Sequence, residues 1–425
     1  MRELHRTNLL RATDALGTAI AQYALPLIVL AITGSVSHSG IAFIAEWLPR
    51  IAILPVAGAL VDRIGGRIVL LIASLLRAVL TLGAVGLLLL YPQQWWTVIV
   101  FGAVGGVLAE FSFLSCEVIG TQVQPGHDVH RVQARQMQID QAALLIGPLC
   151  AAALVAQHPV AALVAVAFLS LATTCGAPLL TVGRPQLDAE KPPQSPLKSM
   201  AVGWRMLRTP VVAWIAVVMG AVQILVALLL AAAPGVALHQ YQKAETDLGT
   251  MWTAAAVVTL LATSVTRRGI DRWGMAPLLI PSGLLLAAAS VMAATVGTFA
   301  AFAVAATAIV AGECAANVVL RTMRTLVIPG HALGATVSVL WVIGLLPYPL
   351  AGLVVAVVPL TVLPAVFAVC GITMGLVIVL GGRQLARYWH QHPAQADHPA
   401  PAPKLSAPVL TSARDKNQAR TPEPV

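Results

Sequence analysis

The sequence predicts an all-α membrane protein whose helices cross the bilayer twelve times. Of its 425 residues, 58% are hydrophobic and only 10% are charged, whereas a soluble domain has roughly 25% charged residues. Twelve apolar stretches fill the chain from Leu9 to Leu380, and each is close to the roughly 20 residues that a helix needs to cross the hydrocarbon. A water-soluble core is therefore excluded, in agreement with the mean hydropathy of +0.84.

Each apolar stretch is expected to form one membrane-spanning helix. The first stretch runs on into the second without the small-residue cleavage pattern of a signal peptide, so we expect it to remain as an anchor. The expected spans are residues 9–32, 39–60, 68–91, 95–116, 136–157, 159–182, 211–234, 248–266, 277–297, 299–320, 333–357 and 359–381.

The positions of the basic residues predict the orientation. All but Arg50, Arg77 and Lys243 of the 26 Lys and Arg lie in the amino-terminal segment, in alternate gaps or in the tail. Apart from Lys243, the opposite gaps carry none, so the positive-inside rule places both termini in the cytoplasm. The net charge of +9 is spread over separate short segments. It therefore predicts attraction to anionic lipid rather than nucleic-acid binding.

Several classes of site find no support in the sequence. The five cysteines lie within or at the ends of apolar spans, without a CxxC pair or a neighbouring histidine at metal-ligand spacing. Phosphate-binding loops, nucleophile elbows, HExxH helices and dinucleotide fingerprints are also missing from the sequence. We expect no enzyme activity, metal site or cofactor, and transport would have to draw on an ion gradient, most simply of protons.

The chain is expected to consist of two related halves. A polar segment at 183–208 separates six spans at 1–182 from six at 209–382, and a Pro/Ala-rich tail at 383–425 is expected to be a disordered cytoplasmic end. Within the linker, residues 197–208 predict an amphipathic helix on the inner membrane surface. VDRIGGR at 61–67 and GIDRWG at 269–274 occupy equivalent gaps, six spans apart. This repeat predicts two pseudo-symmetric six-helix bundles.

The first of these gaps carries a recognisable motif. GALVDRIGGR at 58–67 resembles the signature of the major facilitator superfamily, with Ile68 in place of its last basic residue. The resemblance implies that superfamily's fold over about residues 8–382. Gly58 would allow a close helix approach, and Gly65 with Gly66 would make a tight turn. The predicted cytoplasmic gate consists of Gly58, Asp62, Arg63, Gly65 and Arg67, with Asp271 and Arg272 in the second copy.

Within that superfamily the chain resembles the branch of siderophore exporters of the enterobactin and alcaligin type. The resemblance rests on Asp14, the GALVDR turn, Gly147-Pro148, SPLKSMAVGWRMLRTP at 195–210 and NVVLRTMRTLVIPGHALGATVSVLW at 317–341. It implies export of an iron-chelating metabolite, but related exporters move drugs and other metabolites on the same framework.

Ionisable residues inside the spans are the candidate substrate and proton sites, because burying a charge in hydrocarbon costs at least about 2.5 kcal/mol. Asp14 is interpreted either as a cavity carboxylate or as a capping residue after Thr13. Glu46 and Arg50, four residues apart, predict an ion pair within one helix or an exchange of proton for an anionic ligand. The candidate set is Asp14, Gln22, Glu46, Arg50, Glu110, Glu313, Asn317 and Arg321.

The other polar residues in the spans suggest helix contacts or cavity lining. Glu110 lies beside a glycine-rich face at Gly102, Gly105 and Gly106, and Arg77 is its predicted partner. Glu313, Asn317 and Arg321 share one helical face, which predicts cavity lining in the carboxy-terminal half. Asp140, close to Arg135 and Gln136, predicts a cytoplasmic gate contact.

Two further features allow alternative interpretations. Gly147 and Pro148 are similar to a proline motif of antiporters and predict a hinge, although proline is common in membrane helices. Trp47, Trp252 and Trp341 would either stack on a planar ligand or make ordinary helix and interface contacts.

Three functions remain open from the sequence. The first is a proton-coupled inner-membrane exporter of a siderophore or similar polar metabolite that works by alternating access, as a monomer, with substrate, protons and lipid as its partners. The second is a multidrug or toxic-compound exporter of the same fold. The third is a membrane sensor or partner subunit that does not transport.

Overall fold

The computed structural model describes residues 2–123, 129–180 and 196–391, and every regular element within these ranges is a helix. The amino-terminal helices are α1 (Arg2–Thr33), α2 (Val36–Ile64), α3 (Gly66–Leu90), α4 (Trp96–Val123), α5 (Val129–Gln157) and α6 (Pro159–Gly176), followed by η1 (Ala177–Leu179). After them come α7 (Pro196–Met206), α8 (Pro210–Gly235), η2 (Val236–Gln240), α9 (Glu245–Trp273), η3 (Ala276–Leu278), α10 (Leu279–Thr295), α11 (Phe299–Val327), α12 (Gly330–Leu345), α13 (Pro347–Val357) and α14 (Leu363–Gln391).

Most of these helices are long and apolar enough to cross a membrane. Ten helical segments of the described chain meet this standard by length and composition, and Leu279–Thr295 is a shorter apolar helix. The chain is thus a multi-pass membrane protein. Helix α2, which carries Glu46 and Arg50, is not among the ten, so the predicted count of twelve spans stays a prediction.

Local sequence explains where several helices begin and end. Ser35 caps α2 by accepting a hydrogen bond from the His38 amide at 3.4 Å, and Pro159 begins α6, where a missing N–H is harmless. Gly65 after α2 and Gly274 after α9 have φ of 96° and 81°, values that side chains rarely allow. Both repeat copies therefore end in the same kind of glycine turn.

The predicted span at 333–357 forms two helices instead of one. Helix α12 ends at Leu345 and α13 begins at Pro347. Proline has no amide hydrogen to donate to the preceding turn, and Pro347 is followed two residues later by Pro349. The break places Tyr348 at the junction, where its side chain is buried.

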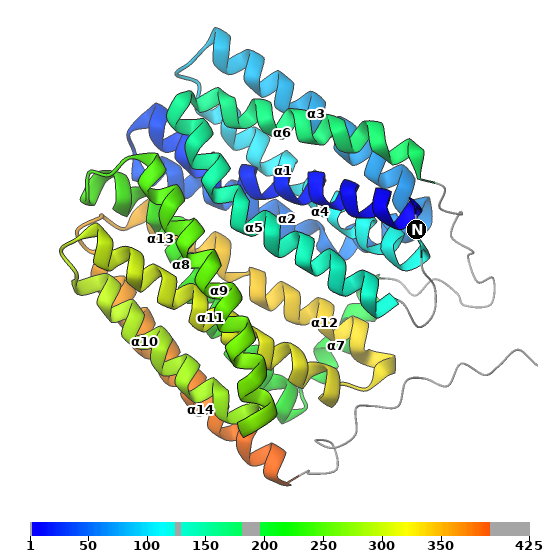
Figure 1. Cartoon of the computed structure of the whole chain (residues 1–425), viewed down its shortest axis with the longest axis vertical. Helices are drawn as coiled ribbons and strands as arrows, with labels where there is room; N and C mark the ends of the chain where they lie inside the picture. The colour runs from blue at the N-terminus through cyan, green and yellow to red at the C-terminus, as the bar shows by residue number, and fades with distance from the viewer. Residues whose placement is uncertain (1, 124–128, 181–195, 392–425) are drawn as a thin grey trace, which may run out of the picture.

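The helices pack in two groups (Figure 1). In the first group α1 packs on α4, α5 and α6, while α3 packs on α4 and α6 and α2 on α4. In the second, α8 and α10 pack on α14, and α9 and α10 pack on α11. The main contacts between the groups are α2 with α13 and α5 with α9. In Figure 1 the axes of the groups diverge toward the end that carries the N-terminus and α7.

The contacts between the groups are closest at the opposite end. A Cβ added to Gly40 of α2 would lie 2.6 Å from the carbonyl oxygen of Gly352 in α13. The Ser37 hydroxyl donates to the Ala356 carbonyl there, and Gly235 of α8 lies against Val36. At the crossing of Gly40 and Gly352 the backbones of α2 and α13 therefore meet without intervening side chains.

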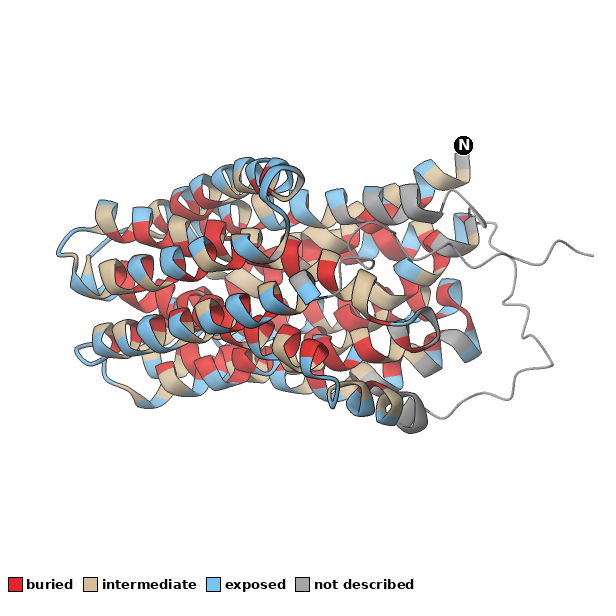
Figure 2. Ribbon diagram, turned by 90° about the horizontal axis from the view of Figure 1, so that it is seen from below, coloured by how far each residue is buried: buried red, intermediate tan, exposed pale blue. Residues whose placement is uncertain are grey.

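The outer surface suits contact with lipid. Buried residues gather between the helices and exposed residues on their outer faces, as Figure 2 shows. On α3 those exposed residues are large and apolar, with Leu76, Val79 and Leu82 at least half exposed. A soluble monomer rarely shows contiguous apolar surface of this kind, but a bilayer covers it.

Helix α7, Pro196–Met206, lies within the predicted linker at 183–208. Its Gly203 packs so closely on α12 that an added Cβ would lie 2.4 Å from the Ala335 carbonyl oxygen. Trp204 and Arg205 are exposed on the other side. The helix is thus joined to the carboxy-terminal group and presents an aromatic and a basic side chain outward.

Candidate functional site

A cavity of about 1690 Å³ lies between the two groups of helices. Its walls come from α1, α2, α4 and α5 on one side and from α8, α9, α11, α12 and α13 on the other. At the divergent end the lining includes Arg63, Met200 and Arg267. This volume exceeds the range of about 300–1,000 Å³ found for drug-sized ligand pockets.

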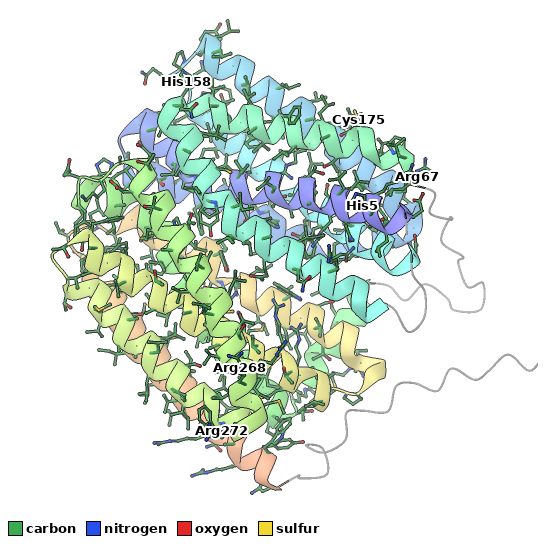
Figure 3. The ribbon with its side chains drawn as sticks, viewed as in Figure 1. His5, Arg67, His158, Cys175, Arg268 and Arg272 are labelled. Carbon is green, nitrogen blue, oxygen red and sulfur yellow. The ribbon has the colours of Figure 1, made fainter. Side chains whose placement is uncertain are left out.

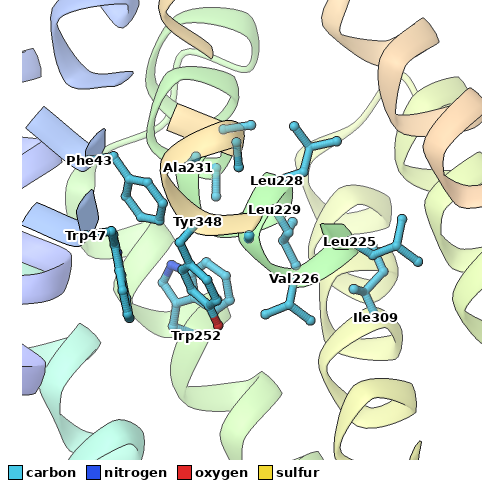
Figure 4. Packing of buried hydrophobic residues seen from close by; sticks show 14 of the residues in the cluster. Phe43, Trp47, Leu225, Val226, Leu228, Leu229, Ala231, Trp252, Ile309 and Tyr348 are labelled. Atoms are coloured by element: carbon cyan, nitrogen blue, oxygen red, sulfur yellow. The ribbon is translucent and has the colours of Figure 1, made fainter. Parts of the chain in front are cut away.

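Aromatic side chains close the cavity at the other end (Figure 4). The rings of Trp47 and Tyr348 have centroids 4.2 Å apart, and Phe43 packs on both. Tyr23 and Trp252 pack with centroids 5.6 Å apart. These pairs join helices of the two groups, so the helix-contact interpretation of Trp47 and Trp252 is confirmed, although both also line the cavity.

Asp14 faces the cavity from the interior of α1. One of its carboxylate oxygens lies 3.8 Å from Nη1 of Arg77, which also donates a hydrogen bond to the Thr18 hydroxyl at 2.9 Å. Both charged side chains are buried. Since α1 already begins at Arg2, the interpretation of Asp14 as a helix cap is wrong.

Arg50 and Glu110 form a buried ion pair between α2 and α4. Nε of Arg50 donates to Oε2 of Glu110 at 2.7 Å, and the guanidinium lies 5.0 Å from the ring centroid of Trp47. Two predicted pairs, Glu46 with Arg50 and Arg77 with Glu110, are therefore wrong. The spacing of four residues satisfies the local rule, but the parallel neighbour α4 presents a better-placed carboxylate.

Glu46 lies behind this pair, outside the main cavity. It lines a separate chamber of about 10 Å³ together with Arg50, Arg77 and Thr18, a volume near that of one water molecule. One carboxylate oxygen, Oε2, has no hydrogen-bond partner. A Cβ on Gly106 would lie 2.7 Å from the Glu46 carbonyl oxygen, so the glycine-rich face of α4 does allow the close helix approach that the sequence predicts.

Arg11 holds α1 to α5 near the divergent end. Its Nε and Nη2 donate to the two oxygens of Asp140 at 2.7 and 2.6 Å, and Nη1 donates to the Phe113 carbonyl at 2.9 Å. The guanidinium also stacks on the Phe113 ring at 4.1 Å. The sequence predicted a gate contact for Asp140 but did not identify Arg11 as its partner. The position of Arg11 inside the first apolar stretch could have indicated that this arginine is buried and paired.

The polar face of α11 lines the cavity from the carboxy-terminal group. Glu313, Asn317 and Arg321 all contribute to the wall, and the Asn317 amide donates a hydrogen bond to Glu313. The Arg321 guanidinium lies 5.8 Å from the ring centroid of Trp341, which is partly exposed. On α1, Gln22 also lines the cavity. The structure therefore places Glu313, Asn317 and Arg321 on one wall of the cavity, as their shared helical face predicts.

The repeated motif lies at the divergent end. Arg67 donates to the Pro178 carbonyl at 2.6 Å and joins α3 to η1, while Arg63 faces the cavity. Gly58 was expected to allow a close helix approach, but an added Cβ would find no atom of the described residues within 4 Å, so no such approach is made in this structure. The side chains of Asp62 and Asp271 lie outside the described residues. Arg272 is exposed, with its guanidinium 5.8 Å from the Trp273 ring centroid.

The predicted hinge is a close helix contact in this state. Helix α5 continues through Pro148 to Gln157. A Cβ on Gly147 would lie 2.5 Å from Cβ of Ala19, so Gly147 allows α5 to pack on α1. Pro148 lines the cavity.

The described residues hold no group of three or more histidine, cysteine or acidic side chains that could bind a metal ion. The polar side chains of the cavity are instead arranged as acid–base pairs and hydrogen-bonding groups. A large cavity between two groups of membrane-spanning helices, mainly apolar but with buried charged side chains in its walls, defines a multi-pass membrane transporter.

Comparison with known proteins agrees with this class. Residues 8–346 match the family model of the Major Facilitator Superfamily, and the chain belongs to this superfamily. Members of this superfamily transport small molecules across membranes. Membership therefore implies a transporter with a small-molecule substrate. A comparison with curated protein sequences gives no significant match.

Solved structures of low sequence identity share the fold. The nucleoside transporter NupG is 9% identical with a TM-score of 0.73, over 89% of this chain and 99% of that one. A bacterial homologue of the iron transporter ferroportin is 15% identical in both of its solved states. The outward-facing state, soaked with iron, gives a TM-score of 0.65 and covers 91% of this chain and 100% of that one. The inward-facing state gives a TM-score of 0.66 and covers 90% of this chain and 98% of that one.

Proposed function

We propose that the chain is a proton-coupled exporter of the bacterial inner membrane that carries a siderophore or a similar polar metabolite by alternating access. The observation that supports this most is the cavity of about 1690 Å³, with charged side chains in its walls, between two groups of helices that diverge at one end. If the groups rock about the cavity, the closed end would separate and the divergent end would close.

The distribution of basic residues supports an inward-facing divergent end. In Figure 3, His5 and Arg67 lie at one end of the first group and His158 at the other, while Arg268 and Arg272 lie at the divergent end of the second group. By the positive-inside rule the arginine-bearing end faces the cytoplasm, so the cavity would take up its substrate there.

The buried charges supply a means of proton coupling. Asp14, Glu46 and Glu110 are three carboxylates around two guanidinium groups, those of Arg50 and Arg77. Uptake of one proton would make this cluster neutral and so reduce its desolvation energy. In this proposal one proton binds to the cluster and leaves it in each transport cycle.

Everted membrane vesicles provide the test. With an imposed proton gradient, addition of the substrate should cause proton movement in vesicles that contain the protein and none in vesicles that lack it. In cells, deletion should trap the siderophore inside while its synthesis continues. Normal secretion by the deletion strain, with the protein verified in the parent, contradicts the proposal.

A second candidate is multidrug export. The aromatic residues Phe43, Trp47, Trp252 and Tyr348 give the closed end of the cavity flat apolar surfaces on which lipophilic cations would stack. Raised sensitivity of the deletion strain to unrelated lipophilic cations, with unchanged growth under iron limitation, would favour this function over siderophore export.

A further inference from the structure

Glu313 differs from the other carboxylates deep in the cavity because it has no ion-pair partner. Asp14, Glu110 and Asp140 each lie within 4 Å of an arginine nitrogen. Within the described residues, Glu313 has the Asn317 amide as a hydrogen-bond donor but no such cation. Glu117 also lacks an ion pair, but its side chain is exposed near the divergent end.

The internal repeat explains the difference. Helices α2 and α9 both have 29 residues and end in matching glycine turns at Gly65 and Gly274, 209 positions apart. Helices α4 and α11 begin at Trp96 and Phe299, 203 positions apart. The offset of 203 positions between α4 and α11 makes Glu313 the counterpart of Glu110.

The partner of Glu110 has no equivalent in the second half. The 209-position offset takes Arg50 to Thr259, whose hydroxyl donates to its own helix at the Ala255 carbonyl. Thr259 lines the cavity, and α9 packs on α11, where Thr263 contacts Cys314 at 3.0 Å. The second copy therefore keeps the carboxylate of the first but not its arginine.

Aromatic side chains line the same cavity as the carboxylate that is left. Tyr23 reaches it from α1 and Tyr348 from α13. Trp252 packs on Tyr23, and all four side chains line the cavity. A carboxylate beside aromatic faces is the combination that recognises alkylammonium groups. Arg321, eight residues further along the same helix face, acts electrostatically on Glu313 but forms no ion pair with it within 4 Å, so it leaves the carboxylate open to a second cation.

We propose that Glu313, with Tyr23, Trp252 and Tyr348, forms a subsite for an ammonium group of the transported molecule. The ammonium takes the place that Arg50 occupies beside Glu110 in the first half. The inference rests on the proposed function in that the ligand is the exported substrate, and it narrows the substrate class to molecules that carry a cationic amine.

Equilibrium binding of phenyltrimethylammonium to the purified full-length protein tests the subsite, with tryptophan fluorescence as the signal. Glu313→Gln should raise Kd about tenfold or more, a factor equal to about 1.4 kcal/mol. Thr259→Arg should weaken binding similarly, because it supplies Glu313 with the guanidinium that the probe would replace. Glu313→Asp, which keeps the charge, should retain most of the affinity and show that the site is folded.

Glu117→Gln is the matched control, since it removes a carboxylate from the cavity wall near the divergent end. Its Kd should stay within about twofold of the wild type, well below a tenfold change. The subsite is overturned if Glu313→Gln binds the probe as tightly as the wild type. It is also overturned if Glu117→Gln weakens binding equally, because the effect would then come from the charge of the whole cavity.

The binding measurement needs no gradient and no transport, so it fails independently of the proposed function. A protein that binds the probe through Glu313 but moves no protons in vesicles would overturn proton-coupled export and leave the subsite intact. A protein that exports while Glu313→Gln binds normally would overturn only the subsite.

Discussion

The Arg50–Glu110 pair illustrates how strongly individual charges are held inside this protein. Both side chains are at least nine-tenths buried and lie 2.7 Å apart. Removing one member of such a pair leaves an uncompensated charge, which typically destabilises a protein by about 3–5 kcal/mol, whereas removing both can be nearly neutral.

We therefore predict that Arg50→Met lowers thermal stability more than the double variant Arg50→Met with Glu110→Gln. The double variant leaves neither a guanidinium nor a carboxylate without its partner. Thermal unfolding of the purified proteins in one detergent would measure the difference. Equal or greater loss in the double variant would show that the pair stabilises the fold as a unit instead.

Glu46 gives a second prediction at the residue scale, because it is the carboxylate left over when Arg50 and Arg77 have paired with Glu110 and Asp14. Glu46→Gln mimics its protonated form and should fold. The rate of proton movement that substrate addition causes should fall at least about tenfold below the wild type. Exchange of substrate inside the vesicle for substrate outside, which needs no net proton transfer, should be retained. Vesicle assays of both activities would measure this separation.

The control for Glu46 is Glu117→Gln, whose side chain is exposed near the divergent end of the cavity. This variant should keep both activities. Unchanged proton movement in Glu46→Gln would rule out Glu46 as the proton-binding residue and transfer that role to another carboxylate of the cluster.

The sequence predicted which charged residues lie within the membrane-spanning helices better than it predicted their partners. A charge inside an apolar stretch is visible in the sequence, so Asp14, Glu110 and Glu313 were found. Pairing depends on the register of helices that are distant in sequence, so Arg77 was matched with Glu110 instead of Asp14. Arg11 was missed as a buried residue because it lies next to the basic amino-terminal segment.

At the scale of elements, the apolar stretches located the helices well because length and hydropathy decide whether a segment spans a membrane. The break at Leu346 was not predicted, although Pro347 and Pro349 were visible, because proline often stays within membrane helices. Pro148 shows this directly, since α5 continues through it. Neighbouring helices decide whether the freed backbone groups are satisfied.

The crossing of α2 and α13 leads to a prediction for Gly40→Leu. A Cβ at this position would lie 2.6 Å from the Gly352 carbonyl oxygen, so the larger side chain should force the two helices apart. Labelling of a cysteine at Ser39, which is buried, by a membrane-impermeant maleimide should become at least about tenfold faster, because the closed end then admits water. Gly83→Leu on α3, where an added Cβ meets no atom within 4 Å, is the control and should leave the rate unchanged.

At the scale of the whole molecule, the duplicated Asp-Arg and glycine turns indicate two related halves, and the glycine turns end helices of equal length in the structure. The sequence could not show that the halves hold their matching carboxylates differently. That asymmetry depends on Arg50 being replaced by Thr259, which becomes apparent only when the helix boundaries fix the offset. A duplicated unit thus provides one carboxylate neutralised by the protein and one available to a ligand.

The closed end of the molecule offers a direct test of alternating access. A Cβ built on Gly235 of α8 lies 3.5 Å from Cβ of Val36 at the start of α2, within the range of about 3.5–4.5 Å that a disulfide requires. Cysteines at these two positions, in a background without the five native cysteines, should cross-link under oxidation. Transport should then stop and recover with reductant, because the two groups can no longer separate at that end.

The same cross-link separates rocking from binding. The oxidised protein should bind phenyltrimethylammonium with unchanged Kd, since the divergent end through which the probe enters stays open. Each single cysteine variant should transport normally in oxidant, which controls for the substitutions themselves. Transport by the fully cross-linked protein would mean that substrate passes without separation of Val36 and Gly235, and the rocking movement would have to be replaced by a local gate.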